Sequence, residues 1–462
     1  MVRATRRGSG LHFMSEREQG KQAAASTRRV VLVTGLLALS FAFSFMDRQV
    51  LPLLIEPVRH TFAMSDTEIG LLQGLAFSTF YACAAIPLGW VVDRYNRVGI
   101  AATCVAAWGV ATAACGLCMN FGQLLVARTA TAVGEAGCSP ASWSILSDLL
   151  SGRALLRATA VYNTGPYVGG GLALILGSMA LRHFTVTGGL ALPLVGHLDP
   201  WQAVFIVLGL PGLILGAVIL TLREPKRREF GVQERDLSTR TTLKVLFGSR
   251  QLMFFFASFV FVTSSLYIVL TWFPSVMIRE GYGTASTIGR PLGVLFLAVG
   301  LSACFLSQFL VRKLDNSDML GTLLRRLSIV LSIQVPLVAV FALIESASAA
   351  YWFYACEVAT LSVTTTFMAS PIELGVPNRM RGRATGLFLL CNNVLGASLG
   401  PAAVGALSDR LKGSPHSLVT AFVIVLGISS VCSVILMYLS STKRAEADIS
   451  DLLQASAVPR NS

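Results

Sequence analysis

Long apolar runs alternate with short polar breaks along the chain. Runs of about 20 residues, enough for a helix to cross a hydrocarbon core of about 30 Å, begin near residues 30, 67, 98, 122, 155, 201, 251, 291, 321, 348, 383 and 416. They lack the two-residue alternation of a membrane strand, so the pattern indicates helices rather than a barrel. The sequence predicts an all-α integral membrane protein with twelve transmembrane helices.

One long polar break, residues 223–250, separates the sixth run from the seventh. We interpret it as a cytoplasmic linker between two six-helix halves, residues 30–222 and 251–441. The polar, basic residues 1–29 are expected to form a disordered cytoplasmic leader, and residues 442–462 a cytoplasmic tail.

Composition and charge support a membrane environment. The chain is 54% hydrophobic and 13% charged, whereas soluble proteins carry about 25% charged residues. With the N-terminus inside, the inner segments hold 29 of the 37 lysines and arginines, the outer loops 6 and the apolar runs 2. This bias follows the positive-inside rule. The net charge of +13 therefore reports topology and not a nucleic-acid partner, and we expect a monomer in the inner (plasma) membrane.

Two motifs of nucleotide and metal chemistry are missing from the sequence, which contains no G-x-x-x-x-G-K-[ST] and no H-E-x-x-H. Cys115 and Cys118 form a C-x-x-C, either a redox or metal pair or simply small residues at a helix end, and no second pair accompanies them. We expect no enzymatic activity, no metal and no cofactor.

Five ionisable residues lie inside the apolar runs: Asp47, Arg48, Arg128, Glu135 and Glu357. A charge near the bilayer centre costs about 3 kcal/mol on insertion scales, so such residues indicate a functional site. Glu357 lies nearer the outer surface, where it would either face a cavity or reach the headgroups.

The four charges of the first and fourth runs are expected to meet. Arg128 and Glu135 are seven residues apart, on one helix face and about 10 Å apart along the axis. Asp47 lies at the depth of Arg128, so Arg128 can pair with Asp47 or with Glu135. Burial favours a protonated carboxyl and a guanidinium favours an ionised one, so Asp47 and Glu135 are candidates for a proton switch. A static interhelical ion pair is the alternative.

The stretch GWVVDRYNR, residues 89–97, resembles the G-x-x-x-D-R-x-x-R signature of the major facilitator superfamily, with Gly89, Asp93, Arg94 and Arg97 at its defined positions. Glycine permits close helix approach, and the charges can latch the inner ends of the two halves. A turn with topogenic arginines is the alternative. GALSDR, residues 405–410, repeats Gly-x-x-x-Asp-Arg on the opposite membrane face.

Two further stretches, FMDRQV and RTATAVGEAG, resemble the D-R and R-x-x-x-x-x-G-E-A patterns of the spinster family. The resemblance extends over most of residues 40–411 and indicates a bacterial member. It implies transport of sphingosine phosphate or lysophospholipids, and it places Asp47, Arg48, Arg128 and Glu135 on the family's charged positions.

Polar residues inside other apolar runs are candidates for lining a substrate cavity, although each can equally form a hydrogen bond between helices. They are Tyr162, Asn163, Tyr267, Glu357, Asn392 and Asn393.

The sequence therefore predicts a proton-coupled secondary active transporter that moves an amphipathic, lipid-like substrate by alternating access. Arg48 and Arg128 would receive the anionic head group when their carboxylates release them. A multidrug or small-metabolite proton antiporter is the alternative within this class. A non-transporting membrane receptor is the alternative from another class.

Overall fold

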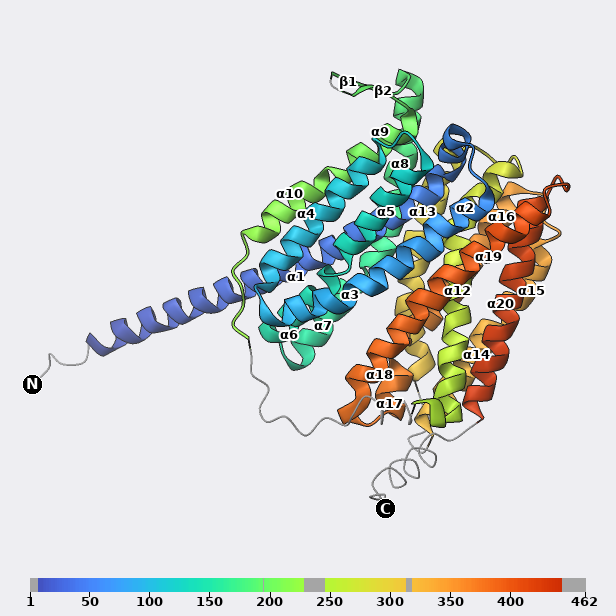
Figure 1. Cartoon of the computed structure of the whole chain (residues 1–462). Helices are drawn as coiled ribbons and strands as arrows, with labels where there is room; N and C mark the ends of the chain where they lie inside the picture. Colours follow the sequence, from blue (N-terminus) through green and yellow to red (C-terminus); the bar gives the residue numbers. More distant parts are fainter. Residues whose placement is uncertain (1–6, 194, 228–245, 313–317, 443–462) are drawn as a thin grey trace, which may run out of the picture.

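The computed structural model describes residues 7–193, 195–227, 246–312 and 318–442, which are helical apart from one β-hairpin and the connecting turns (Figure 1). The elements of the N-terminal half are α1 (Arg7–Phe62), α2 (Asp66–Gly70), η1 (Leu71–Ala76), α3 (Phe77–Arg94), α4 (Arg97–Cys115), α5 (Phe121–Glu135), α6 (Cys138–Leu149), α7 (Gly152–Tyr162), α8 (Gly165–Thr187), β1 (Leu190–Leu192), β2 (Gly196–Leu198), α9 (Pro200–Gly209) and α10 (Pro211–Leu220).

The elements of the C-terminal half are α12 (Arg250–Arg279), α13 (Ala285–Leu306), η2 (Ser307–Val311), α14 (Met319–Ser332), α15 (Gln334–Phe341), α16 (Ala347–Thr366), α17 (Ser370–Gly375), α18 (Asn378–Cys391), η3 (Asn392–Gly396), α19 (Ala397–Arg410) and α20 (Ser417–Ser441). Of the short elements, η1 and η3 are π-helical turns and η2 is a 3₁₀ turn.

Ten helical stretches of the described residues are long and apolar enough to cross a membrane. The runs predicted near residues 122 and 348 are helical but are not among the ten. The first is divided into α5 and α6 at Ala136 and Gly137, so its pieces have 15 and 12 residues. The second corresponds to α16, which has 20 residues.

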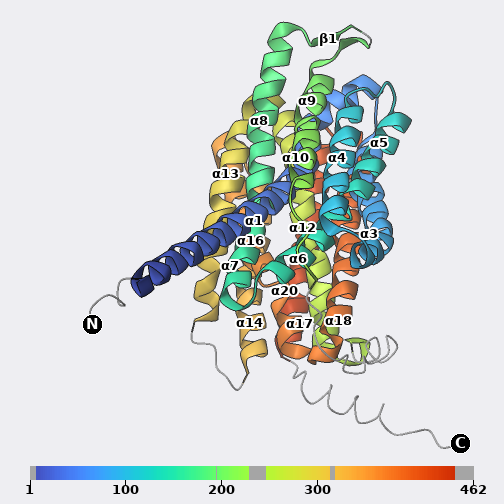
Figure 2. The ribbon, with the colours of Figure 1, turned by 90° about the vertical axis from the view of Figure 1, so that its left-hand side faces the viewer.

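Helix α1 begins at Arg7 and so includes most of the predicted disordered leader. Residues 16–25 are mainly Glu, Gln, Lys and Ala, which favour helix, and the first proline inside α1 is Pro52. Figures 1 and 2 show this part of α1 projecting away from the bundle. Most of the predicted linker, residues 228–245, and the tail after residue 442 lie outside the described residues.

Polar caps fix where several helices begin. Ser65 and Glu68 form a capping box at the start of α2, and Asn96 and Asn120 accept backbone N–H groups at the starts of α4 and α5. These side chains satisfy donors that the helix leaves unpaired. Gly188 ends α8 with φ +77°, a left-handed conformation that favours glycine. The chain then forms the antiparallel β1–β2 hairpin.

Small residues allow the two halves to approach closely. A Cβ on Gly70 would lie 2.7 Å from the Pro401 carbonyl oxygen, where the α2–η1 segment meets α19. A Cβ on Gly293 of α13 would lie 2.5 Å from the carbonyl oxygen of Gly171 in α8. These contacts need glycine because any side chain would force the helices apart.

The two ends of the bundle differ. At the end that carries the β1–β2 hairpin, which we call the hairpin end, α2 lies against α19. At the opposite end, which we call the α18 end, the α6–α7 turn and the α17–α18 turn lie apart (Figure 1).

Candidate functional site

Two ion pairs join α1 to α5. Arg128 Nη1 donates to Asp47 Oδ2 at 2.9 Å, and Arg48 Nε and Nη2 lie 2.8 and 2.7 Å from Glu135 Oε2. The structure thus brings together the four charged residues that the sequence singled out. Of the two partners predicted for Arg128, it selects Asp47, while Glu135 pairs with Arg48.

The Asp47–Arg128 pair is buried. Each side chain is 2% exposed, and Thr112 Oγ1 donates to the second carboxylate oxygen, Oδ1, at 2.5 Å. Both oxygens of Asp47 therefore accept a hydrogen bond. Among the described residues, the Nε atom of Arg128 has no acceptor. The pair holds α1 against α5 but offers no surface to a ligand.

The Arg48–Glu135 pair is more accessible. The Arg48 side chain is 14% exposed, whereas that of Glu135 is 1% exposed. Ser44 Oγ also donates to Glu135 Oε2, at 2.6 Å, so this oxygen accepts all the hydrogen bonds given to the carboxylate. The other oxygen, Oε1, is buried with no partner among the described residues. A proton can therefore be added at Oε1 without displacing a hydrogen bond.

Aromatic rings surround the guanidinium of Arg48. Its Cζ lies 4.8 Å from the Phe77 ring centre, 4.9 Å from that of Tyr81 and 5.2 Å from that of Phe45. Phe77 also lies 5.3 Å from Arg128 Cζ, so one ring contacts both cations. Cation–π contacts contribute about 0.5–2 kcal/mol each. Arg48 therefore keeps favourable contacts if Glu135 releases it.

Sequence reasoning did not identify Phe77, Tyr81, Ser44 or Thr112 as parts of the site. Phe77 is the first residue of α3, directly after the π-helical turn η1. Such turns change the register of a helix and often occur at functional sites. An uncharged residue inside an apolar run gives no signal in the sequence that it contacts a charge.

The C-terminal half contributes three of the predicted cavity residues near the interface. Tyr267 of α12 is half-buried and lies close enough to Arg48 to interact with it electrostatically. Asn392 is buried and accepts a hydrogen bond from Thr263 at 2.9 Å, so it joins α12 to η3. The Asn393 side chain donates to the Leu389 carbonyl within its own helix.

Three other predicted cavity residues lie elsewhere. Tyr162 is 1% exposed and stacks on Phe41 at 4.5 Å, inside the N-terminal half, so it serves packing rather than lining a cavity. Asn163 is exposed at the end of α7. Glu357 is 0% exposed and bonded to Gln334, so it neither lines a cavity nor reaches headgroups here.

The G-x-x-x-D-R-x-x-R motif forms no hydrogen bond or ion pair between the halves within the described part of the chain. A Cβ on Gly89 would meet no atom within 4 Å. Asp93 and Arg94 are exposed, and Arg94 stacks over Trp90 at 4.0 Å. Arg97, predicted as part of an inter-half latch, is instead buried and paired with Asp148 of its own half and with Glu224 at the start of the linker.

The hairpin end carries a different set of inter-half contacts, beginning with Arg279 at the end of α12. Its Nη1 and Nη2 atoms donate to the two oxygens of Asp66 at 2.8 and 2.7 Å, and its Nε donates to Glu56 at 2.8 Å. Asp66 and Glu56 are 3% and 6% exposed. Fork-like pairs of this kind are among the stronger ion pairs.

The repeated G-x-x-x-D-R of α19 completes these contacts. Asp409 accepts hydrogen bonds from the backbone N–H groups of Asp66 and Thr67, at 3.2 and 2.8 Å, and from Thr67 Oγ1 at 2.6 Å. A Cβ on Gly405 would lie 2.1 Å from the Asp66 carbonyl oxygen. We call Glu56, Asp66, Thr67, Arg279, Gly405 and Asp409 the hairpin-end latch. Sequence reasoning did not identify this latch, although the repeated G-x-x-x-D-R motif was a signal.

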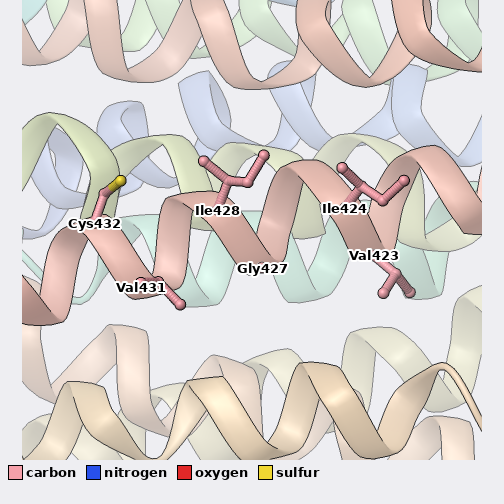
Figure 3. A pocket seen from close by; sticks show the side chains of 6 residues that line it. All are labelled: Val423, Ile424, Gly427, Ile428, Val431 and Cys432. Atoms are coloured by element: carbon pink, nitrogen blue, oxygen red, sulfur yellow. The ribbon is translucent and has the colours of Figure 1, made fainter.

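An apolar groove follows the outer face of α20 (Figure 3). It is lined by Val423, Ile424, Gly427, Ile428, Val431 and Cys432. None of these side chains carries a charge, so the groove lacks the chemistry to bind an anionic head group. Its composition is that of a surface in contact with lipid tails.

A bundle of apolar helices in two halves, touching along glycines and holding buried ion pairs, defines a membrane transporter. Comparison with known proteins agrees: the model of the Major Facilitator Superfamily matches residues 37–401, and the chain belongs to this superfamily.

The chain is similar to several members of the superfamily. It is 25% identical to an MFS-type efflux pump of Mycolicibacterium smegmatis, over 90% of this chain and 94% of the pump. It is 24% identical to protein spinster of Drosophila melanogaster, over 81% of this chain and 61% of that protein. Its fold matches the crystal structure of a bacterial homologue of spinster in an inward-facing, unoccupied conformation, with TM-score 0.72, 24% identity and coverage of 93% and 99%.

Proposed function

We propose that this protein is a proton-coupled secondary active transporter that moves an amphipathic anion, such as a lysophospholipid or sphingosine phosphate, by alternating access. The observation that carries the proposal is the Arg48–Glu135 pair. It combines an arginine side chain that is 14% exposed with a buried carboxylate, one oxygen of which has no hydrogen-bond partner among the described residues.

Protonation of Glu135 would release Arg48. With the proton on Oε1, Glu135 loses the charge that holds the guanidinium, and Arg48 remains among its aromatic rings. A guanidinium binds phosphate oxygens through two parallel hydrogen bonds, so the released Arg48 suits the head group of a lysolipid. Proton binding and anion binding are then linked because both act on one guanidinium.

The Asp47–Arg128 pair is proposed to open after the Arg48–Glu135 pair. The Asp47–Arg128 pair is closed on both sides, so it opens only when α1 and α5 move apart. Asp47 then gains access to protons and Arg128 to the anion, which makes this pair the inner, later part of the switch.

The two ends of the bundle support alternating access. If the basic segments lie in the cytoplasm, with twelve spans and both termini inside a bacterial inner membrane, the hairpin end faces outward. The hairpin-end latch then closes the outer side, while the α18 end, where the halves lie apart (Figure 1), faces the cytoplasm. Transport requires the latch to open.

The test is flux of a labelled lysophospholipid in vesicles that contain only this protein, with and without an imposed proton gradient. The gradient should change the wild-type rate at least several-fold. Glu135→Gln, which cannot exchange a proton, should transport at a rate that ignores the gradient. The matched control is Glu345→Gln, which alters an exposed carboxylate and should behave like wild type. A full gradient response in Glu135→Gln would exclude Glu135 as the switch.

A multidrug proton antiporter is the second candidate, favoured by the similarity to the mycobacterial efflux pump. The two candidates differ in the charge of the preferred ligand, because Arg48 attracts anions and repels cations. Unlabelled lysophospholipid should compete with the labelled substrate, whereas a cationic dye should not. Strong competition by the dye and none by the lysolipid would favour the antiporter.

A further inference from the structure

A buried carboxyl in the C-terminal half takes no part in the function proposed above. Glu357 lies in α16 and Gln334 begins α15, and both are 0% exposed. Gln334 Nε2 donates to Glu357 Oε2 at 3.0 Å. Within the described residues, Oε1 of Glu357 and Oε1 of Gln334 are both buried without a hydrogen-bond partner.

Among the residues that the structure describes, no cation forms an ion pair with Glu357. The titratable residues of the helices packed against α16 are Arg250, Tyr267 and Arg279 of α12, Arg290 and Cys304 of α13, and Arg325 and Arg326 of α14. None of these forms an ion pair or hydrogen bond with Glu357, and α15 carries no titratable residue. Tyr354, one turn earlier on α16, is buried among phenylalanines. An ionised carboxylate with one neutral donor in such a place costs several kcal/mol.

We propose that Glu357 is a second proton-binding site, which holds its proton on Oε1 and shares it with Gln334. The carboxylic O–H then donates to Gln334 Oε1 while Gln334 Nε2 donates to Glu357 Oε2, closing a ring of two hydrogen bonds. One proton thereby satisfies both oxygen atoms that otherwise lack a partner. The site is independent of the Glu135 switch, because it lies in the other half and contacts no arginine.

Infrared spectroscopy of the purified protein at neutral pH tests this proposal, because the carbonyl stretch of a protonated carboxyl differs from that of a carboxylate. Wild type and Glu135→Gln should both show the protonated band. Glu357→Gln should lose the band assigned to this site, and the exposed-site control Glu345→Gln should keep it. A Glu135→Gln spectrum with no protonated band would overturn the proposal, even if Glu357→Gln failed to fold. So would a band unchanged in Glu357→Gln.

The pH dependence of thermal unfolding gives a second readout that does not use transport. An unfolded glutamate ionises above about pH 4.3, whereas Glu357 stays protonated in the folded chain. The Tm of wild type minus the Tm of Glu357→Gln should therefore fall as the pH rises from about 5 to 8, because only the unfolded wild-type chain loses this proton. A gap that stays constant over this range would show that Glu357 is ionised in the folded protein. Either outcome leaves the flux test of Glu135 unaffected.

Discussion

The two copies of Gly-x-x-x-Asp-Arg have nearly the same local sequence and opposite surroundings. In α19, Gly405 lies against the backbone of α2 and Asp409 accepts hydrogen bonds from the first N–H groups of that helix. In α3, a Cβ on Gly89 would meet nothing within 4 Å, and Asp93 is exposed. In the described part of the chain, one copy forms hydrogen bonds between the halves and the other forms none.

The difference shows that the motif provides a glycine and a carboxylate that can contact a helix start. The arrangement of the two halves decides whether a helix start lies close enough to be contacted. A carboxylate after a glycine can approach a helix start closely and accept from its unpaired N–H groups, where the helix dipole favours a negative charge. At the hairpin end such a helix start is present at Asp66. The same chemistry predicts that the α3 copy engages the C-terminal half when the α18 end closes.

The largest effect on the hairpin-end latch is expected from Arg279→Ala. Asp66 would lose its two guanidinium hydrogen bonds and keep only the Ser408 hydroxyl at 2.6 Å and the more distant Arg59 at 3.5 Å, which costs about 3 kcal/mol. The closed hairpin end should become less populated by roughly a hundred-fold. Spin labels at the exposed residues Met119 and Ser414, in a chain without its nine native cysteines, should report a longer distance. Arg290→Ala, an exposed arginine near the same end, should leave the distance unchanged.

A smaller effect is expected from Gly405→Ala. The new methyl group would lie 2.1 Å from the Asp66 carbonyl oxygen, so α19 and α2 must separate, at a cost of about 2 kcal/mol. The same pair of labels should show the shift. Gly89→Ala is the matched control in the other copy, because its methyl group meets no neighbour. Equal effects of the two substitutions would contradict the assignment of the latch to the hairpin end.

The smallest effect is expected from Asp409→Ala, which removes the hydrogen bonds that α19 accepts from the first residues of α2 but leaves Arg279 on Asp66. Loss of these hydrogen bonds costs about 1 kcal/mol, so the closed hairpin end should become roughly five-fold less populated. Asp93→Ala should not weaken this end, since Asp93 forms none of its contacts. Opening of the hairpin end by Asp93→Ala would mean that the two copies are not independent.

The charged residues of the candidate site were predictable from the sequence, but the ion pairs that they form were not. Charged residues inside apolar runs are rare, so Asp47, Arg48, Arg128 and Glu135 stood out. The partner of each was not predictable, because Asp47 and Arg48 are adjacent and point in different directions from α1. The contacts between Arg48 and its aromatic neighbours were not predictable for another reason. Phe77 belongs to an apolar run, in which a phenylalanine is expected and does not indicate a contact with a charge.

The positions of the helices were determined largely by the sequence, because a run of about 20 apolar residues forms a helix in lipid for local reasons. The break at Ala136 and the helical leader depended on local detail that hydropathy does not resolve.

The sequence by itself thus determined that this chain is a helical membrane protein with charges buried at specific depths. Only the tertiary structure decided that Glu135 holds Arg48, that Asp66 holds Arg279, and that Glu357 lies beside the amide of Gln334. The physical reason is that burial and ion pairing depend on neighbours brought from distant parts of the chain; Asp66 and Arg279 are 213 residues apart. The spacing of apolar residues in the sequence predicts the helix to which a residue belongs. Whether a buried charge is paired depends on the side chains of the neighbouring helix.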